Sequence, residues 1–312
     1  MHAGVTGGAL LVAGGANFPE KRPWEGGTKI WYDDIWVLGK PDGQWRKAGK
    51  LPKPVGYGVS VTWKDEVICA GGSNADGHLA NVYALRLGDD GSIINRTLPS
   101  LPKPSANTCG VLIGDILYVA GGIEKADATQ AMHNFWSLNL ADLAATWQTL
   151  PPWPGPARML ATAGAHDGAF HLFTGAGLHA GTDGKPARDW LKDAYRYTPG
   201  KDNKAGTWVK LADVPQVAVA ACTPAPSVDR GLLLLCGDDG GKVGFKPETE
   251  HPGFPKGAQL FDVVSGEWRR LPDGPLSRAT VPTTMWNGRI IIPSGEARPG
   301  FRSSEVWSVE VK

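Results

Sequence analysis

"LYVAGG", residues 117–122, is the stretch that decides the fold, because variants of it recur along the whole chain. Counted at the last glycine, the spacings between copies are 57, 50, 53, 62 and 58 residues. A period of this length indicates a repeat architecture in which each copy belongs to one structural unit. The six copies are "LLVAGG" at 10–15, "VICAGG" at 67–72, "LYVAGG" at 117–122, "HLFTG" at 171–175, "LLLCG" at 233–237 and "IIPSG" at 291–295.

The sequence around each glycine strand predicts three further strands per unit. One precedes it, as in "YGVSVTW" at 57–63, and another follows after a variable loop, as in "HNFWSLNL" at 133–140. A tryptophan strand with a Leu-Pro exit, such as "WRRLPDGP" at 268–275, completes most units. Four strands in about 50 residues is the pattern of the Kelch form of the β-propeller. We therefore predict an all-β, six-bladed Kelch-type propeller that forms a single domain over residues 1–312.

The propeller explains the composition, which is rich in glycine (42), proline (25) and tryptophan (13). A twisted four-stranded sheet cannot bury both faces alone, but radial packing against two neighbours covers them and leaves only short edges. The glycines allow the strands to approach closely. We expect the tryptophans to fill the wedge that opens between blades as the radius grows.

The number of outer strands does not match the number of glycine strands. Only five outer strands accompany six glycine strands, and the chain ends directly after "EVWSVEV" at 305–311. We therefore expect the last blade to lack its outer strand in this chain; in a ring closed by strand exchange, that strand would come from residues upstream of Met1. "GGALLVAGGA" at 7–16 has the apolar character of a signal-peptide core, but no Lys or Arg precedes it, and the repeat assigns it to a blade.

The charge balance argues against two classes of partner. Lys and Arg number 32 against 31 Asp and Glu, a net charge of +1, and no basic stripe marks a nucleic-acid surface. No apolar run approaches the roughly 18 residues of a membrane span. We expect neither nucleic acid nor membrane as a partner.

The four cysteines, Cys69, Cys109, Cys222 and Cys236, lie in apolar strand-like runs without CxxC spacing. This placement favours small buried hydrophobic residues. A Cys222–Cys236 disulfide remains an alternative, because the two residues would fall on neighbouring strands. The redox compartment therefore stays open.

The loops that follow the glycine strands are long, whereas turns at the opposite ends, such as "NG" at 287–288, are tight. Strands alternate in direction within a blade, so these long loops emerge on one face, where function on such scaffolds is found. Four of the six residues that follow the glycines are neutral, so the scaffold does not require a carboxylate there. The six residues are Ala16, Ser73, Ile123, Ala176, Asp238 and Glu296.

Glu296 and Arg302 in "SGEARPGFR", residues 294–302, are the charges that the turn itself does not need. We expect Glu296 at the mouth of the central channel, and Arg302 in the same loop within reach of it. From the residues alone, two interpretations of Glu296 remain: a catalytic or ligand-binding group, or a turn carboxylate that is solvated or paired with an arginine. Arg302 is equally well explained by a salt bridge to Glu296 or Glu305.

Other constellations are weak. The seven histidines show no HxH or HExxH spacing, and we treat His179 and His251 as loop residues. We therefore predict no metal site. The paired ligands of copper oxidases, the repeated boxes of sialidases and a phosphate-binding loop are also missing from the sequence.

"AGGANFP" at 13–19 together with "SGEARPGFR" resembles the N-acetylneuraminate epimerase family, the sialic acid mutarotases, in a cyclically permuted order. The blade that carries the Gly-Glu-Ala element is last here and the blade with the Gly-Gly-Ala strand end is first, so the order around the ring is kept. The resemblance implies an isomerase of carbohydrate metabolism that interconverts the α and β anomers of N-acetylneuraminate or a close relative. It also implies that Glu296 and Arg302 are catalytic.

This chemistry suits the two side chains. A carboxylate can remove the proton of the anomeric hydroxyl and deliver a proton to the ring oxygen, worth roughly 10²–10⁴ in rate. An arginine binds a sugar carboxylate through two hydrogen bonds. No cofactor is called for. Five further residues are candidates for substrate contacts from the loop face: Asn17, Lys29, Trp31, Arg158 and Asp238.

Other outcomes stay open at this level. A Kelch protein-interaction module would use the same loops but predicts apolar loop tips without a charged pocket. An enzyme that acts on a different sugar is another alternative. The expected partner is a small sugar acid, a homodimer is compatible with the sequence, and the location is either periplasmic or otherwise exported, or cytoplasmic.

Overall fold

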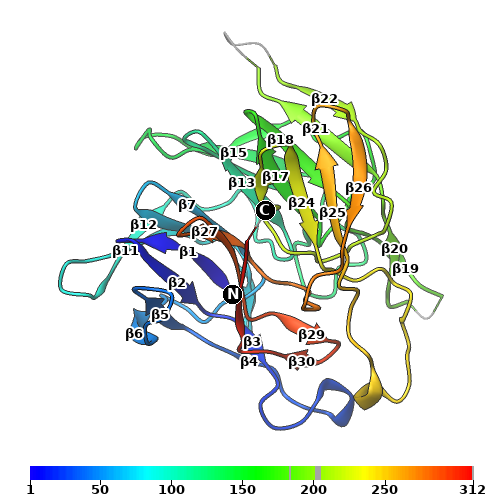
Figure 1. Ribbon diagram of the computed structural model, residues 1–312, viewed down its shortest axis with the longest axis horizontal. Coiled ribbons are helices and arrows are strands. Elements are labelled where there is room, and N and C mark those ends of the chain that lie inside the picture. The colour runs from blue at the N-terminus through cyan, green and yellow to red at the C-terminus, as the bar shows by residue number, and fades with distance from the viewer. Residues whose placement is uncertain (183, 201–204, 311–312) are drawn as a thin grey trace.

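The predicted ring of blades is present in the structure, a computed structural model that describes residues 1–182, 184–200 and 205–310. Its described residues form six antiparallel sheets arranged around a central axis (Figure 1). Five sheets have four strands and the last has three. The six-bladed propeller predicted from the repeat is therefore confirmed.

The strands of each blade are given from the axis outward. Blade one holds β1 (His2–Thr6), β2 (Ala9–Ala13), β5 (Asp34–Leu38) and β6 (Arg46–Lys50). Blade two holds β7 (Val59–Trp63), β8 (Glu66–Ala70), β11 (Val82–Leu87) and β12 (Ile93–Leu98). Blade three holds β13 (Cys109–Ile113), β14 (Ile116–Ala120), β15 (Phe135–Asn139) and β16 (Gln148–Leu150).

The remaining blades follow the same order. Blade four holds β17 (Thr162–His166), β18 (Ala169–Phe173), β21 (Ala194–Thr198) and β22 (Thr207–Lys210). Blade five holds β23 (Ser227–Val228), β24 (Gly231–Leu235), β25 (Ala258–Asp262) and β26 (Glu267–Leu271). Blade six holds β27 (Thr284–Trp286), β28 (Arg289–Pro293) and β31 (Val306–Val309).

The first and last blades have the strands expected from the sequence. The stretch with signal-peptide character forms the buried strand β2 of blade one. Within the described residues, β31 pairs with β28 alone, so blade six has the three strands expected from the count. The ring closes where β1 packs against β27.

The tryptophans hold neighbouring blades together. The indole N–H of Trp147 in blade three donates to the carbonyl oxygen of Pro99 at the exit of blade two, at 2.8 Å. Trp208 in blade four donates in the same way to Pro151, at 2.8 Å. Trp268 repeats the contact one blade further on. Each ring packs on an apolar cluster shared by two blades, which confirms the predicted wedge role.

The glycine pair is needed where each strand leaves the sheet. Gly121 and Gly122 have φ angles of 64° and 102°, in the left-handed region that favours glycine. A Cβ atom on Gly121 would lie 2.4 Å from the carbonyl oxygen of Arg158. The chain can therefore turn sharply from the blade into the loop face.

The loops that follow the glycine strands contain short elements of regular structure. Four of them form short two-stranded ribbons, and two contain 3₁₀ turns, η1 (Pro23–Glu25) and η2 (Glu248–Glu250). The ribbons are β3 (Ala16–Asn17) with β4 (Ile30–Trp31), β9 (Ser73–Asn74) with β10 (Gly77–His78), β19 (Ala176–Ala180) with β20 (Pro186–Trp190), and β29 (Glu296–Arg298) with β30 (Phe301–Arg302).

The cysteines behave as small core residues. Cys69, Cys109, Cys222 and Cys236 are all buried and carry free thiols. The alternative of a Cys222–Cys236 disulfide is therefore not realised in this structure. As to membranes, among the described residues there is no helix of the length and apolar character that a bilayer crossing needs.

Candidate active site

Glu296 and Arg302 face each other across the β29–β30 ribbon. The ribbon register pairs the two residues directly, and Gly300, with a φ angle of 75°, forms the turn between them. Arg302 Nη1 lies 2.5 Å from Glu296 Oε1. The backbone N–H of Gly300 donates to the same carboxylate oxygen at 2.7 Å. A local turn thus brings together two charges that are six residues apart in the sequence.

The pair is shielded from solvent rather than spread on the surface. The side chain of Glu296 is 17% exposed and that of Arg302 is 16% exposed. Burial acts to lower the pKa of Arg302, but the charge of Glu296 and the phenol of Tyr57 outweigh it and raise that pKa. Arg302 is therefore a permanent cation beside the carboxylate.

A row of four backbone hydrogen bonds runs around the channel next to this pair. In each of blades two to six, a residue that precedes the inner strand has a positive φ angle. From blade three onward, this residue donates its N–H to the carbonyl oxygen of its equivalent in the preceding blade, at distances from 2.8 to 2.9 Å. The five ring residues are Tyr57, Asn107, Leu160, Ala220 and Thr280. The ring gives the channel mouth a rigid rim.

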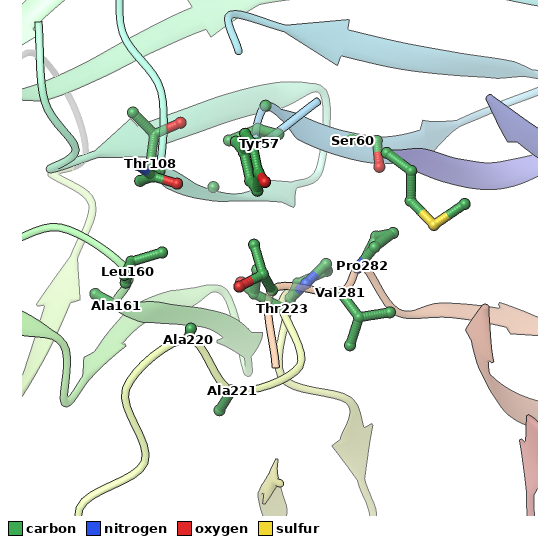
Figure 2. Close-up of a pocket in the computed structure, with 17 residues that line it drawn as sticks. Tyr57, Ser60, Thr108, Leu160, Ala161, Ala220, Ala221, Thr223, Val281 and Pro282 are labelled. Carbon is green, nitrogen blue, oxygen red and sulfur yellow. The ribbon is translucent and has the colours of Figure 1, made fainter. Parts of the chain in front are cut away.

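A cavity of about 580 Å³ lies on the loop side of this rim. All five ring residues line it, and so do both Glu296 and Arg302. On the other side of the rim a narrow space of about 40 Å³ continues into the channel, and Tyr57 and Thr223 point into this space (Figure 2). The charged residues that line the larger cavity are Lys29, Asp76, Arg188, Asp238, Glu296 and Arg302.

The structure confirms that the residues after the glycines are equivalent between blades. In each of blades two to six, that residue forms an antiparallel bridge with the residue just before the ring position. Glu296 bridges Ala279, and Asp238 bridges Val219. Two neighbouring blades therefore present a carboxylate from the same position of the fold into one cavity.

Asp238 lies in a more apolar setting than an ordinary surface carboxylate. Its Oδ1 accepts a hydrogen bond from the N–H of Gly240 at 3.0 Å. Burial raises the pKa of Asp238, and this effect outweighs the opposing influences of that hydrogen bond and of Arg188. The ionised form of Asp238 is therefore less favourable in the folded protein than in a fully exposed aspartate.

The other predicted contact residues are divided between two hollows. Lys29 and Trp31 line the cavity with Glu296, whereas Asn17 lines a neighbouring hollow of about 320 Å³ that also reaches Arg302. The Oδ1 atom of Asn17 accepts a hydrogen bond from the N–H of Phe18 at 2.8 Å. Asn17 therefore borders the site but stands outside the main cavity.

Arg158 does not reach the cavity, and its predicted role as a substrate contact is wrong. Its side chain is fully buried, and Nη2 lies 2.6 Å from Oδ2 of Asp193. Nη1 donates to the carbonyl oxygen of Thr174 at 2.9 Å. Arg278, the equivalent residue of blade six, makes the same kind of contact with Glu305 at 2.6 Å. This position, two residues before the ring, points into the blade, so its arginines are structural.

Tyr57, Asn107 and Thr280 line the cavity and were missed by the sequence analysis. They precede the inner strands, a position where the repeats share no residue type. The signal that could have found them is their constant distance from the last glycine of the repeat, because Tyr57, Asn107 and Thr280 each precede it by 15 residues. Within the described residues, no group of three or more His, Cys, Asp or Glu side chains is placed to hold a metal ion.

Comparison with known proteins supports the resemblance over most of the chain. The family model for N-acetylneuraminate epimerase matches residues 1–94 and 98–240. The N-acetylneuraminate epimerase of Haemophilus influenzae strain 86-028NP is 28% identical over 233 residues, which cover 67% of this chain and 58% of that protein. The chain thus spans under two thirds of the length of this relative.

A shorter match of higher identity lies in the N-acetylneuraminate epimerase of Salmonella enteritidis PT4. It is 43% identical over 84 residues, covering 24% of this chain and 21% of that protein. The solved structure of YjhT matches with a TM-score of 0.72 at 15% identity, over 100% of this chain and 94% of that one, which supports the fold. Because the family model covers well over half of its residues, this chain belongs to the N-acetylneuraminate epimerase family.

Proposed function

We propose that this protein is an N-acetylneuraminate epimerase, a mutarotase that interconverts the α and β anomers of the free sugar acid. Membership of the family supports this assignment. The observation that carries it is the Glu296–Arg302 pair, held at 2.5 Å in the wall of a cavity. The family model ends at residue 240, so the roles of these two residues rest on the geometry of the ribbon.

Glu296 supplies the proton chemistry in this proposal. Its carboxylate takes the proton of the anomeric hydroxyl, the bond between the anomeric carbon and the ring oxygen breaks, and the ring oxygen receives the proton. The open-chain ketone rotates about the bond between its carbonyl carbon and the neighbouring CH₂ group, and the same steps in reverse close the ring on the other face. One carboxylate serves as base and then as acid, and the reaction needs no other reagent.

Arg302 has two tasks in this proposal. Its Nη1 lies 2.5 Å from Oε1 of Glu296 and fixes the position of the carboxylate that accepts the proton. Its Nη2 is directed to the hydroxyl of Tyr57 at 3.3 Å. The guanidinium thus borders both the base and the part of the cavity where the sugar carboxylate would bind.

The character of the cavity favours an enzyme over a protein-interaction module. The module predicts apolar loop tips without a charged pocket, whereas six charged side chains line this cavity. A small polar acid is the kind of ligand that such a wall accommodates. The proposed partner is therefore a sugar acid rather than a protein.

Anomer-resolved proton NMR tests the proposal directly. Freshly dissolved crystalline N-acetylneuraminate starts as one anomer, and the two anomeric forms give separate signals as they equilibrate. We expect the protein to shorten the equilibration time in proportion to its concentration. An equilibration time that is the same with and without the protein would reject the proposal.

A further inference from the structure

Tyr57 lies between two cations. Its hydroxyl oxygen accepts from Nη2 of Arg302 at 3.3 Å and from Nζ of Lys29 at 3.4 Å. Neither side chain can accept a hydrogen bond in return, because guanidinium and ammonium groups are donors only. The phenolic proton of Tyr57 is therefore free to be donated to something else in the cavity. Three side chains from three different blades thus form a continuous row of donors.

Lys29 has an unusual environment for a lysine. Its ammonium nitrogen lies 5.5 Å from the ring centre of Phe18, 5.3 Å from that of Trp31 and 5.1 Å from that of Tyr57. In the part of the chain that the structure describes, Lys29 forms no ion pair with a carboxylate. Aromatic faces attract a cation without neutralising it. Lys29 therefore lies at the wall of the cavity without a carboxylate beside it among the described residues.

The other two members of the row, Arg302 and Tyr57, contribute no uncompensated charge to the cavity. Arg302 is already compensated by Glu296 at 2.5 Å, so the pair together carries no net charge. Tyr57 contributes a dipole. Lys29 is the member whose charge is uncompensated, and a bound anion would gain most from it.

The loop that carries Lys29 is fixed to the ribbon that carries Arg302. The rings of Trp24 and Phe301 pack at 5.7 Å, and the guanidinium of Arg22 lies 4.1 Å from the Phe301 ring centre. Figure 1 shows the β3–β4 and β29–β30 ribbons at the same side of the molecule. The spacing of the row is therefore set before any ligand arrives, which lowers the entropy cost of binding.

We propose that Lys29, Tyr57 and Arg302 together form the receptor for the substrate's carboxylate, and that Lys29 makes the site selective for a sugar acid over a neutral sugar. This inference rests on the proposed function and deepens it. Tyr57 donates its free proton to the carboxylate, Arg302 donates from the side away from Glu296, and Lys29 provides the net charge. Lys29 is thereby a specificity-determining residue.

The test compares N-acetylneuraminate with its methyl ester, which keeps the anomeric hydroxyl but has no charge. In Lys29→Met the unbranched stem can still pack against the rings while the charge is lost. We expect kcat/KM for the acid, relative to that for the ester, to fall roughly 10- to 100-fold, as for a lost hydrogen bond between charged groups. The loss should appear mainly as a higher KM, and Lys29→Arg should restore much of the ratio.

Lys21→Met is the matched control, because Lys21 is an exposed lysine of the same loop that does not line the cavity. Its acid-to-ester ratio should equal that of the parent protein. An unchanged ratio in Lys29→Met, with parent activity present, would overturn the inference while leaving the proposed function intact. A Lys29→Met protein with a lower melting temperature and an unchanged ratio would show that Lys29 only fastens the loop. Failure of the parent protein to act on either compound would instead reject the proposed function.

Discussion

Asp238 and Glu296 occupy equivalent positions in blades five and six, and both carboxylates line the same cavity. The first is half-buried and forms no ion pair with any residue that the structure describes, and the second lies 2.5 Å from an arginine. The same backbone position thus supports two different electrostatic environments. This difference makes the two residues separable by experiment.

Asp238→Asn should stabilise the fold at neutral pH. The folded pKa of Asp238 is raised above its ordinary value of 3.8, so the folded state binds more protons than the unfolded state between the two values. The stability of the parent protein therefore falls as the pH rises through that window. Asparagine does not titrate, so the gain in melting temperature should grow as the pH rises above the ordinary value of 3.8.

Asp90→Asn is the control for this measurement, because hydrogen bonds from Ser92 lower the pKa of Asp90 instead of raising it. Asp90 does not line the cavity. The effect should therefore have the opposite sign: the control should lower the melting temperature at neutral pH, and this loss should shrink as the pH falls. A gain of equal size at every pH in Asp238→Asn would contradict the view that burial of the charge causes it.

Arg158→Met should unfold more easily but keep its activity per folded molecule. The substitution leaves Asp193 half-buried without its partner at 2.6 Å, and breaking a buried pair in this way costs about 3–5 kcal/mol. Urea unfolding measures the loss, and the NMR assay on the folded protein measures turnover. A variant that keeps its stability but loses turnover would show that Arg158 takes part in the active site.

Arg302→Lys should impair both binding and turnover. Arg302 uses one nitrogen toward Glu296 and another toward Tyr57, and a lysine has a single nitrogen that cannot hold both positions. We expect a higher KM and a lower kcat, measured from the initial rate of anomer equilibration. Arg289→Lys, at an exposed ion pair with Glu310, is the control that should behave as the parent does. Equal kinetics in both variants would remove Arg302 from the site.

Exhaustive chelation should leave the activity unchanged. Neither the spacing of the seven histidines nor the placement of side chains in the described residues brings three metal-ligating groups together. The measurement is the NMR assay after dialysis against EDTA. Activity that disappears on chelation and returns with zinc or calcium would show that a metal takes part.

The sequence predicted the fold and the central pair because both depend on local signals. The glycine strands recur at a regular period, and Glu296 and Arg302 lie on either side of a short turn at Gly300. Tyr57 could not be placed in the same way. It meets Arg302 across 245 residues of sequence, through the closure of the ring, and its direction is set by a positive φ angle that tyrosine rarely adopts.

Arg158 is a residue that the sequence placed in the site and the structure places in the core. From the sequence, an arginine close to the loop face is expected to contact solvent or a ligand, since arginine is seldom fully buried. The structure buries it because the carbonyl oxygen of Thr174 and the carboxylate of Asp193 satisfy its donors. Arg278 repeats the arrangement two residues before Thr280, as Arg158 lies two before Leu160. Comparison of these two repeats would have been the useful signal.

Glu296→Gln tests the central claim most directly. The amide keeps the size of the side chain and can still accept the N–H of Gly300, but it cannot take a proton from the sugar. With circular dichroism confirming a folded protein, NMR on freshly dissolved N-acetylneuraminate should show that catalysed equilibration slows by roughly 10² or more. A Glu296→Gln protein that equilibrates the anomers as fast as the parent would contradict the account.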